Sequence, residues 1–494
     1  MPQPPRLLND LLDTLSVRVV HGSPRCPVQC VVADSRDVVP GSLFVAVRGL
    51  QSDGHEFLGE ALDRGAVALV LEALPPELAL RAQREGQAVV QVPSSRAALA
   101  AIASAYHQNP SRALRLIGIT GTNGKTTTSY VVESILQAAG LTVGVIGTVE
   151  YRFATHRQVA PQTTPDVLRL QALLAQMRQS HVDYAVLEVS SHALDQGRVD
   201  SCEFAVCVFT NLSRDHYDYH TSEAAYFAAK KRLFTTLPGQ WHVLNLDDVY
   251  GQKLLHASRA RVLTYGLNSE ATLTPHAVAH SLDGIRFALP TTKGTLAVRS
   301  ALVGRHNVYN LLAGIATALA LDVEAEAIVE GIARLAQVPG RLERIDQGQC
   351  FHVFVDYAHT PDALEQVLQL VRTETAGRLI VVFGCGGDRD PGKRPLMGRV
   401  ATTISDYTII TSDNPRTEEP EQIIADIVAG VDTASAYTTI PDRREAIAYA
   451  ITIAQPHDTV VIAGKGHEDY QIIGQVRRHF DDREVAREAL RSRS

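Results

Sequence analysis

The chain has 494 residues, of which 45% are hydrophobic and 20% charged, values typical of a globular protein and too apolar for a disordered one. At roughly 150 residues per domain, a chain of this length is expected to form about three domains. The formal net charge of −7 argues against a general nucleic-acid-binding protein, which would usually carry a strongly basic domain, but arginines can still bind anionic ligands locally.

Six cysteines are too few for a disulfide framework in a chain of this length. Cys26 and Cys30 have a spacing that metal ligands can have, but no second pair completes a zinc set, and we expect small buried hydrophobes. The N-terminal segment MPQPPRLLNDLLDTL has no basic region followed by an apolar core, so no signal peptide is expected. No apolar run approaches the roughly 20 residues of a membrane helix. We therefore expect a cytoplasmic protein with no membrane insertion and no nucleic-acid partner.

Residues 1–112 form the first expected domain, which mixes short strands with helices. The segments 42–47 and 66–71 are predicted strands, and 94–110 is a predicted helix that ends at Asn109-Pro110. An apolar strand at 114–119 then leads into a glycine-rich loop, which indicates that a new domain begins.

Residues 113–338 form the second expected domain, in which apolar strands alternate with helices. This alternation predicts a parallel sheet that is covered on both faces. The region around 270–300 alternates instead like exposed β-structure, and 307–322 is a predicted helix. A linker is expected around 338–340. The predicted strands of the sheet are 114–119, 141–147, 184–190 and 204–210.

Residues 339–494 form the third expected domain, again with alternating strands and helices. Because parallel strands have their C-terminal ends at one edge of a sheet, the loops that follow them should meet at one site. These loops carry the sequences YAHTPD, GCGGDRD, DNPRTEEP and GKGHED. The predicted strands are 351–356, 378–384, 407–413 and 458–464.

A glycine-rich loop with the sequence GITGTNGKTTT, beginning at Gly118, joins the strand at 114–119 to a helix. Such a loop can turn backbone N–H groups toward phosphates at a helix N-terminus, while Lys125 reaches the β- and γ-phosphates and Thr126 binds Mg²⁺. The strict pattern GxxxxGK[ST] fails, because Ile119 stands where its first glycine belongs. A glycine-rich turn with an incidental lysine is the alternative, and the order strand, loop, GKTTT and helix disfavours it. The expected nucleotide-binding residues here are Gly121, Thr122, Asn123, Gly124, Lys125, Thr126 and Thr127.

Two further side chains are candidate partners of a metal-bound ATP. Glu188 ends an apolar strand, where a lone carboxylate is costly unless it meets a cation. His216 follows the next strand and its loop. Glu188 could also be a surface strand residue, and His216 could lie in an ordinary polar loop. The spacing of His216 and His220 is weak evidence for zinc.

These motifs together resemble the Mur ligases of peptidoglycan synthesis. The resemblance rests on the order GITGTNGKTTT, LEVSSHALDQGRVD, NLSRDHYDYH, GRHNVYN, Pro-Gly-Arg and VDYAHTPD, and it extends from about residue 30 to 483. It implies an α/β fold of three domains: a UDP-binding N-terminal domain, a central P-loop ATPase with a parallel sheet, and a C-terminal Rossmann-like domain that accepts an amino acid. It also implies ATP and Mg²⁺, and a reaction in which ATP phosphorylates a carboxylate that the incoming amine then attacks. Positioning and charge neutralisation, which such a reaction requires, suit these residues.

The resemblance also implies roles for individual residues, carried over by matching position. Lys125, Thr126, Glu188 and His216 would form the ATP and metal centre. Asn310, Arg341 and Asp356 would hold the nucleotide, although Asn310 alone would be a helix-surface amide and Arg341 a linker cation. Ser35 would contact the UDP moiety. Gln162 stands where asparagine is expected, and retains the amide. The rest of the nucleotide-sugar peptide would be held by Thr163, Thr164, Ser190, Gln196 and Arg198.

Lys230 lies in the predicted helical stretch AAYFAAKKRLF, where a surface lysine is the default interpretation. Its position resembles that of a family lysine which takes up CO₂ as a carbamate, and a carbamate supplies an oxygen ligand of the kind Mg²⁺ prefers. Lys231 is adjacent, but the preceding YFAAK favours Lys230.

The segment DNPRTEEP (413–420) resembles members of the family that add meso-diaminopimelate. That amino acid carries an ammonium and a carboxylate at its far end, whereas lysine carries only the ammonium. Arg416 could pair bidentately with the carboxylate. Arg416 could instead pair with Glu418 or Glu419 on the same loop. The expected acceptor-binding residues are Arg389, Asp413, Asn414, Pro415, Arg416, Gly464 and Glu468.

The expected function is ATP-dependent addition of meso-2,6-diaminopimelate to the D-Glu of UDP-MurNAc-L-Ala-D-Glu, by a chain acting as a monomer. A lysine-adding ligase of the same family is the nearest alternative, and Arg416 argues against it. A folylpolyglutamate-synthase-like ligase would not account for the N-terminal domain or for DNPR. A P-loop ATPase acting as a switch or transport motor would have no use for the clustered C-terminal loops.

Overall fold

The computed structural model describes residues 4–15, 17–49, 52–217, 219–268, 270–432 and 434–493. The first three residues of the segment in which no signal peptide is expected lie outside the described residues. The chain divides by its internal contacts into two compact units. Unit 1 comprises residues 1–274 with 312–328, and unit 2 comprises 275–311 with 329–494.

Unit 1 begins with a five-stranded sheet in the order β2-β7-β6-β5-β4, in which only β2 runs antiparallel to its neighbour. The strands expected at 42–47 and 66–71 are confirmed as β5 and β6. The helix expected at 94–110 is α4, which ends before Asn109, whose φ of 49° is incompatible with a continued helix. The elements are β1 (Arg6–Leu7), α1 (Leu8–Leu12), β2 (Arg18–His21), β3 (Pro27–Val28), β4 (Cys30–Val32), η1 (Ser35–Asp37), β5 (Ser42–Val45), η2 (Gly54–Phe57), α2 (Leu58–Asp63), β6 (Ala68–Leu71), α3 (Pro76–Glu85), β7 (Ala88–Gln91), α4 (Ser95–Tyr106) and α5 (Pro110–Ala113).

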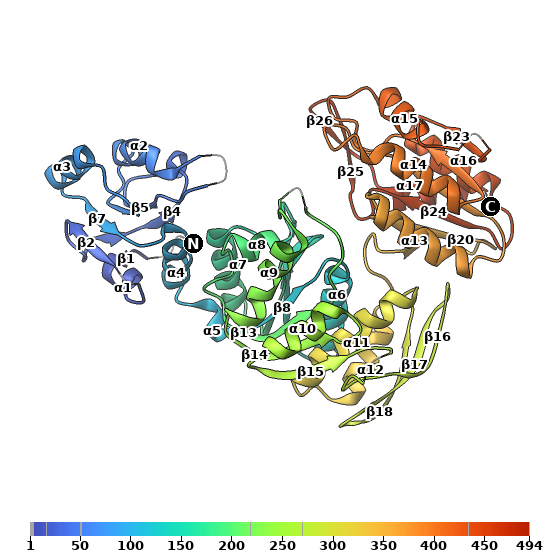
Figure 1. Ribbon diagram of the computed structural model, residues 1–494, viewed down its shortest axis with the longest axis horizontal. Coiled ribbons are helices and arrows are strands. Elements are labelled where there is room, and N and C mark those ends of the chain that lie inside the picture. Colours follow the sequence, from blue (N-terminus) through green and yellow to red (C-terminus); the bar gives the residue numbers. More distant parts are fainter. Residues whose placement is uncertain are drawn as a thin grey trace. The chain divides into compact units, whose positions relative to one another are not determined.

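The second sheet of unit 1 has eight strands in the order β11-β10-β9-β12-β8-β13-β14-β15, parallel from β9 to β15. Figure 1 labels β8, β13, β14 and β15 of this sheet. All four strands predicted from the sequence are present, as β8, β9, β12 and β13. The strands are β8 (Arg115–Thr120), β9 (Val143–Ile146), β10 (Glu150–Phe153), β11 (His156–Val159), β12 (Tyr184–Glu188), β13 (Phe204–Phe209), β14 (Gly239–Asn245) and β15 (Arg261–Tyr265). The helices are α6 (Lys125–Ala138), α7 (Val167–Gln179), α8 (Ser191–Asp195), α9 (Glu223–Thr235) and α10 (Val249–Ala257), while α11 (Arg305–Ala320) and α12 (Ala325–Arg334) contribute residues to both units.

Unit 2 contains an antiparallel sheet, β16-β17-β18. Burial alternates along β17 and β18, as expected for 270–300, whereas β16 is exposed along its whole length. Its larger sheet has the order β19-β20-β24-β21-β22-β23 and is parallel from β20 to β23. The strands are β16 (His276–Ser281), β17 (Gly284–Thr291), β18 (Gly294–Ser300), β19 (Glu343–Arg344), β20 (His352–Asp356), β21 (Leu379–Phe383), β22 (Tyr407–Ile410), β23 (Tyr437–Thr439), β24 (Thr459–Ala463), β25 (Tyr470–Ile473) and β26 (Val476–His479). The helices are α13 (Pro361–Glu374), α14 (Lys393–Ile404), α15 (Pro420–Val428), α16 (Arg443–Ile453) and α17 (Asp482–Arg493).

The larger sheet of unit 2 is covered on both faces, as its continuous apolar strands predict. Successive strand residues belong to different cores, because their side chains point to opposite faces. Val381 packs with α13, α14 and α15, whereas its neighbours Ile380 and Val382 pack with α16 and α17. These helices surround the sheet in Figure 1. The predicted α/β fold class is confirmed, while the domain boundaries at 112/113 and 338/339 stay a prediction.

Within the described part of the chain, no helix is both long enough and apolar enough to span a membrane.

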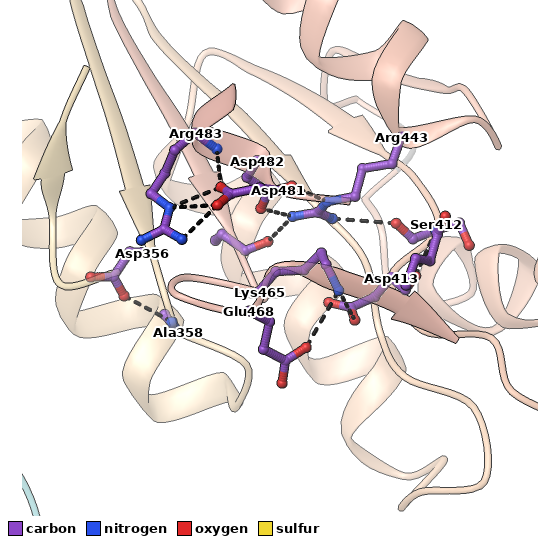
Figure 2. Close-up of polar contacts among 12 residues, drawn as sticks. Asp356, Ala358, Ser412, Asp413, Arg443, Lys465, Glu468, Asp481, Asp482 and Arg483 are labelled. Atoms are coloured by element: carbon purple, nitrogen blue, oxygen red, sulfur yellow. Dashed lines mark hydrogen bonds and ion pairs between the residues drawn. The ribbon is translucent and has the colours of Figure 1, made fainter. Parts of the chain in front are cut away.

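A buried ion pair joins α16 to α17 in unit 2. The guanidinium of Arg443 donates to both carboxylate oxygens of Asp482, and both side chains are fully buried. It also donates to the carbonyl oxygen of Ser412, two residues after β22 (Figure 2), and to that of Ala463, the last residue of β24. One cation therefore ties two helices to the two strands that precede the DNPR and GKGHED loops.

We predict that Arg443→Met lowers the free energy of unfolding by about 3–5 kcal/mol, because it leaves the Asp482 carboxylate buried without a partner. The matched control is Arg444→Met, whose ion pair with Glu488 is exposed and is expected to contribute about 0–1 kcal/mol. Urea denaturation followed by circular dichroism measures both. Equal midpoints for the two variants would contradict the role of the pair.

Candidate functional site

The phosphate loop connects β8 to α6 in unit 1, at the C-terminal edge of the parallel strands. Gly121 has no room for a side chain, because a Cβ atom there would lie 1.9 Å from Oγ1 of Thr210. Gly124 caps α6 with a φ of 86°, in the left-handed region that favours glycine. Gly118 belongs to β8 and makes room for the ring of Phe204, so its role is packing against β13.

Asn211, which follows β13, clamps this loop and was not singled out from the sequence. Its Oδ1 accepts from the backbone N–H of Asn123 at 3.0 Å, and its Nδ2 donates to the carbonyl of Asn123 at 3.1 Å. Thr210 Oγ1 donates to the same carbonyl, and the hydroxyl of Thr122 accepts from the N–H of Ser213 at 3.0 Å. The residues that follow the neighbouring strand β13 therefore hold the loop in shape. In a parallel sheet, side chains that form a site are expected at the C-terminal ends of the strands.

Two lysine side chains share one acceptor at the loop. The ammonium groups of Lys125 and Lys230 each lie 2.9 Å from the carbonyl oxygen of Gly121. Lys230 is 1% exposed and its Nζ lies 4.6 Å from the centre of the Tyr226 ring. Burial, and then repulsion by Lys125, lower the pKa of Lys230 well below its usual value. The alternative of a surface lysine is therefore wrong for Lys230, which faces the phosphate loop.

Glu188 ends β12 and is 1% exposed. Its carboxylate accepts from Oγ1 of Thr126 at 2.9 Å, and from both Oγ1 and the N–H of Thr148 at 2.9 and 3.1 Å. A Cβ atom on Gly147 would lie 2.2 Å from this carboxylate, so glycine there admits the glutamate. The alternative of a surface strand residue is wrong for Glu188. Thr148, at the end of β9, was missed by the sequence reasoning.

His216 lies in the loop after β13, with a φ of 56° and a half-exposed side chain. Its Nε2 is 3.3 Å from Asp215, and its ring lies edge-on to that of His192 at 4.8 Å. Among the described residues, no three histidine, cysteine, aspartate or glutamate side chains lie close enough to hold a metal ion.

The residues expected to hold the nucleotide-sugar peptide gather around the C-terminal end of β12. Thr164 Oγ1 donates to the carbonyl of Glu188 and accepts from the N–H of Ser190. Arg198 donates to Oε1 of Gln196, to Oε1 of Gln162 at 2.9 Å and to the carbonyl of Thr164 at 2.7 Å. The longer amide at Gln162 thus reaches the guanidinium. The hydroxyl of Thr163 lies 3.1 Å from that of Thr148.

Ser35 lies apart from this group, in the 3₁₀ helix η1 beside the first sheet. It is 6% exposed, and its hydroxyl donates to Oε2 of Glu60 at 2.9 Å. Its contact with a UDP moiety stays a prediction.

Three expected nucleotide-binding residues belong to unit 2. Asn310 is buried in α11 and donates to Oδ1 of Asn307 at 2.8 Å. Asp356 accepts from the N–H groups of Leu342 and Ala358 at 2.7 and 2.8 Å, and burial raises the pKa of its carboxyl group. The guanidinium of Arg341 lies 5.1 Å from the centre of the Tyr357 ring. The alternative of a helix-surface amide is therefore wrong for Asn310.

The expected acceptor-binding residues of unit 2 come together at the C-terminal ends of β22 and β24. Asn414 Nδ2 donates to Oε2 of Glu468 at 3.0 Å, and its Oδ1 accepts from the N–H of Ile472 at 2.9 Å. A Cβ atom on Gly464, whose φ is 116°, would lie 2.7 Å from Oδ2 of Asp413. The loops DNPR and GKGHED therefore converge as predicted.

Arg416 sits beside the loop that follows β21. Its Nη1 donates to the carbonyl of Gly387 at 2.7 Å, and it makes no salt bridge within the described residues. Glu418, the proposed competitor, is bound by the buried guanidinium of Arg394 at 2.8 Å. Pro415 packs its carbonyl against Gly387, and Arg389 is exposed.

Three family descriptions match successive parts of the chain. They are "Mur ligase family, catalytic domain" over residues 27–107, "Mur ligase middle domain" over 119–318 and "Mur ligase, glutamate ligase domain" over 340–466.

Full-length relatives and solved structures extend this similarity. The UDP-N-acetylmuramoyl-L-alanyl-D-glutamate–2,6-diaminopimelate ligase of Geobacter metallireducens is 44% identical over 99% of both chains. A solved structure of a ligase with the same name is 36% identical, covers 100% of this chain and 99% of its own, and gives a TM-score of 0.73. Mycobacterium tuberculosis folylpolyglutamate synthase, solved with ADP and AMPPCP, shares the fold at 21% identity, with a TM-score of 0.58 over 73% of this chain and 91% of its own.

We predict that Gly121→Ala weakens ADP binding by at least about 10-fold, because the added methyl group collides with Thr210 and displaces the loop. Gly140→Ala is the matched control, since Gly140 also has a positive φ but nothing lies within 4 Å of its Cβ position. Isothermal titration calorimetry of both variants compares their affinities. An affinity for ADP that is unchanged in Gly121→Ala would remove the loop from the nucleotide site.

Proposed function

This chain belongs to the Mur ligase family, and we propose that it adds meso-2,6-diaminopimelate to the D-Glu of UDP-MurNAc-L-Ala-D-Glu at the expense of ATP. The single observation that carries the choice of acceptor is Arg416. Its guanidinium has no carboxylate partner in the described residues, and it shares one loop with Asp413 and Asn414. The names of the full-length relatives support the same acceptor.

ATP is placed by the phosphate loop in this proposal. Backbone N–H groups at the start of α6 face the phosphates, and Lys125 neutralises charge on the transferred group. The free carboxylate of the D-Glu residue attacks the γ-phosphorus, which gives an acyl phosphate and ADP. The amine of diaminopimelate then attacks the acyl carbon, and the tetrahedral intermediate loses phosphate and a proton to leave the amide. Holding amine and acyl phosphate together supplies much of the acceleration.

Mg²⁺ is part of the proposal, and the donors near the loop suit it. Glu188 and the hydroxyl of Thr126 are already in contact, and hard oxygen ligands are those that Mg²⁺ prefers. Lys230 would add a third oxygen ligand as a carbamate, and His216 is the fourth expected ligand. A bound Mg²⁺ would neutralise phosphate charge. The low pKa of Lys230 favours the uncharged amine, which is the form that reacts with CO₂.

The remaining substrate contacts are proposed from position. Ser35 would contact the UDP group, and Thr163, Thr164, Ser190, Gln196 and Arg198 would hold the sugar and peptide. Asn310, Arg341 and Asp356 would hold the nucleotide, and Arg389 and Gly464 would line the acceptor site. The chain is proposed to act as a monomer in the cytoplasm.

Phosphate release tests this function directly. The full chain is incubated with ATP, Mg²⁺ and UDP-MurNAc-L-Ala-D-Glu, with meso-diaminopimelate, L-lysine or no acceptor. Release that requires both the UDP substrate and diaminopimelate, with a tripeptide product by mass, is the expected result. Release with lysine alone would make the chain a lysine-adding ligase, and release without any acceptor would indicate an ATPase.

We predict that Arg416→Ala raises the KM for diaminopimelate by about 10- to 100-fold, the loss expected for one charge-assisted pair. The affinity for ATP should not change, because the phosphate loop is untouched. Arg399→Ala, an exposed arginine on α14, is the control and should match the wild type. Steady-state kinetics with each substrate varied separate these effects, and an unchanged KM for diaminopimelate in Arg416→Ala would reject Arg416 as the carboxylate ligand.

We predict that Lys230→Ala lowers kcat by about 100-fold or more, the scale seen when a group that stabilises transferred charge is removed. Lys231→Ala should retain activity, because the carbamate is proposed on Lys230 alone. With ¹³CO₂, the wild type and Lys231→Ala should show a carbamate carbon signal by NMR that Lys230→Ala lacks. A signal that persists in Lys230→Ala would assign the carbamate elsewhere.

A further inference from the structure

Lys465, in the GKGHED loop after β24, is fully buried in unit 2. Its Nζ lies 3.3 Å from Oε2 of Glu468 and 3.9 Å from Oδ1 of Asp413 (Figure 2). It also lies 3.2 Å from Oδ1 of Asn414. These three partners are all expected acceptor-binding residues. Burying an ammonium group is energetically unfavourable unless it is paired. The buried ammonium of Lys465 therefore requires these three partners.

The cluster fixes the direction of each polar group around it. Asn414 Oδ1 accepts from Lys465 and from the N–H of Ile472, which leaves Nδ2 to donate to Glu468. Oε2 of Glu468 accepts from both Asn414 and Lys465. Replacing the ammonium by an apolar group would free the amide to turn and would leave two carboxylates facing each other without a cation.

The charge of the cluster suits an ammonium ligand. One cation, Lys465, stands against two carboxylates, Asp413 and Glu468, which leaves one negative charge. Arg443 also acts on both carboxylates, but Asp482 already neutralises it. Tyr357, Cys385, Tyr470 and His359 also interact with one or both of these carboxylates, and burial disfavours the charged form of each of the four. Burial raises the pKa of Tyr357 and Cys385 to about 12, raises the pKa of Tyr470 and lowers that of His359.

We propose that Lys465 is a positioning residue of the acceptor site, which pairs with Asp413 and Glu468 and holds Asn414 so that this cluster receives the ammonium at the far end of the acceptor. This inference rests on the proposed function. Arg416 would bind the carboxylate of the same far centre, while the Lys465 cluster binds its ammonium. Without Asp413 and Glu468, the acceptor site would contain only the positive charges of Arg416 and Lys465, which would repel the ammonium of the acceptor.

The test is the kinetics of Lys465→Met in the full chain. Because the cluster would lose its cation, the KM for diaminopimelate should rise at least about 10-fold, with kcat at saturation and the KM values for ATP and the UDP substrate within about 2-fold of the wild type. Lys293→Met, on the turn between β17 and β18, is the control for the same substitution elsewhere in unit 2. Lys465→Gln, which keeps a donor without the charge, should show the same rise and provides the answer if the methionine variant does not fold.

The comparison across substrates distinguishes positioning from general structural damage. Positioning confines the rise in KM to diaminopimelate, whereas damage to the fold of unit 2 would impair the use of all three substrates. An unchanged KM for diaminopimelate, or equal losses for all three substrates, would overturn the proposal. A wild type that does not use diaminopimelate would instead overturn the proposed function.

Discussion

Both units depend on one constraint: a cation that is buried away from water needs partners that compensate for its lost hydration. Enclosing an ammonium or guanidinium costs several kcal/mol unless partners compensate for it. The chain solves this in two ways. Arg443 and Lys465 in unit 2 are enclosed with carboxylates. Lys230 in unit 1 has a carbonyl, a tyrosine ring and a second lysine as neighbours, and burial and repulsion by Lys125 lower its pKa well below the usual value. In the proposed reaction, Lys465 serves recognition of the acceptor, whereas the uncharged amine of Lys230 reacts with CO₂.

The parallel sheets turn these local solutions into sites. Glu188 ends one strand of the central sheet, and Asn211 and Thr148 follow two others. Asn211 binds Asn123 of the phosphate loop, Glu188 accepts from the hydroxyl of Thr126, and Thr148 donates to Glu188. In unit 2, Arg443 binds the last carbonyl groups before the DNPR and GKGHED loops, and Lys465 joins the loops themselves. The buried contacts of Arg443 and Lys465 therefore position the loops of the proposed acceptor site.

Much of this arrangement could be predicted from the sequence, because it follows from periodicity and strand ends. The four strands predicted for each parallel sheet are present, and the convergence of the C-terminal loops needed only the parallel order. Residues such as Asn211, Thr148, Arg443 and Lys465 could not be assigned in this way. Their roles depend on contacts between side chains that are far apart in the sequence, and residue type alone does not predict these contacts. From the sequence alone, a lysine between two glycines in GKGHED would be expected to be a solvated loop residue. The structure shows that Lys465 is buried.

In the proposed reaction, the acceptor site selects an amino acid with both charges at its far end. A competition experiment tests it most directly: the wild-type chain is given ATP, UDP-MurNAc-L-Ala-D-Glu and equal concentrations of meso-diaminopimelate and L-lysine, and the two tripeptide products are resolved by mass. A carboxylate ligand such as Arg416 predicts at least about 10-fold more diaminopimelate product. Equal amounts of the two products, or an excess of the lysine product, would contradict the claim.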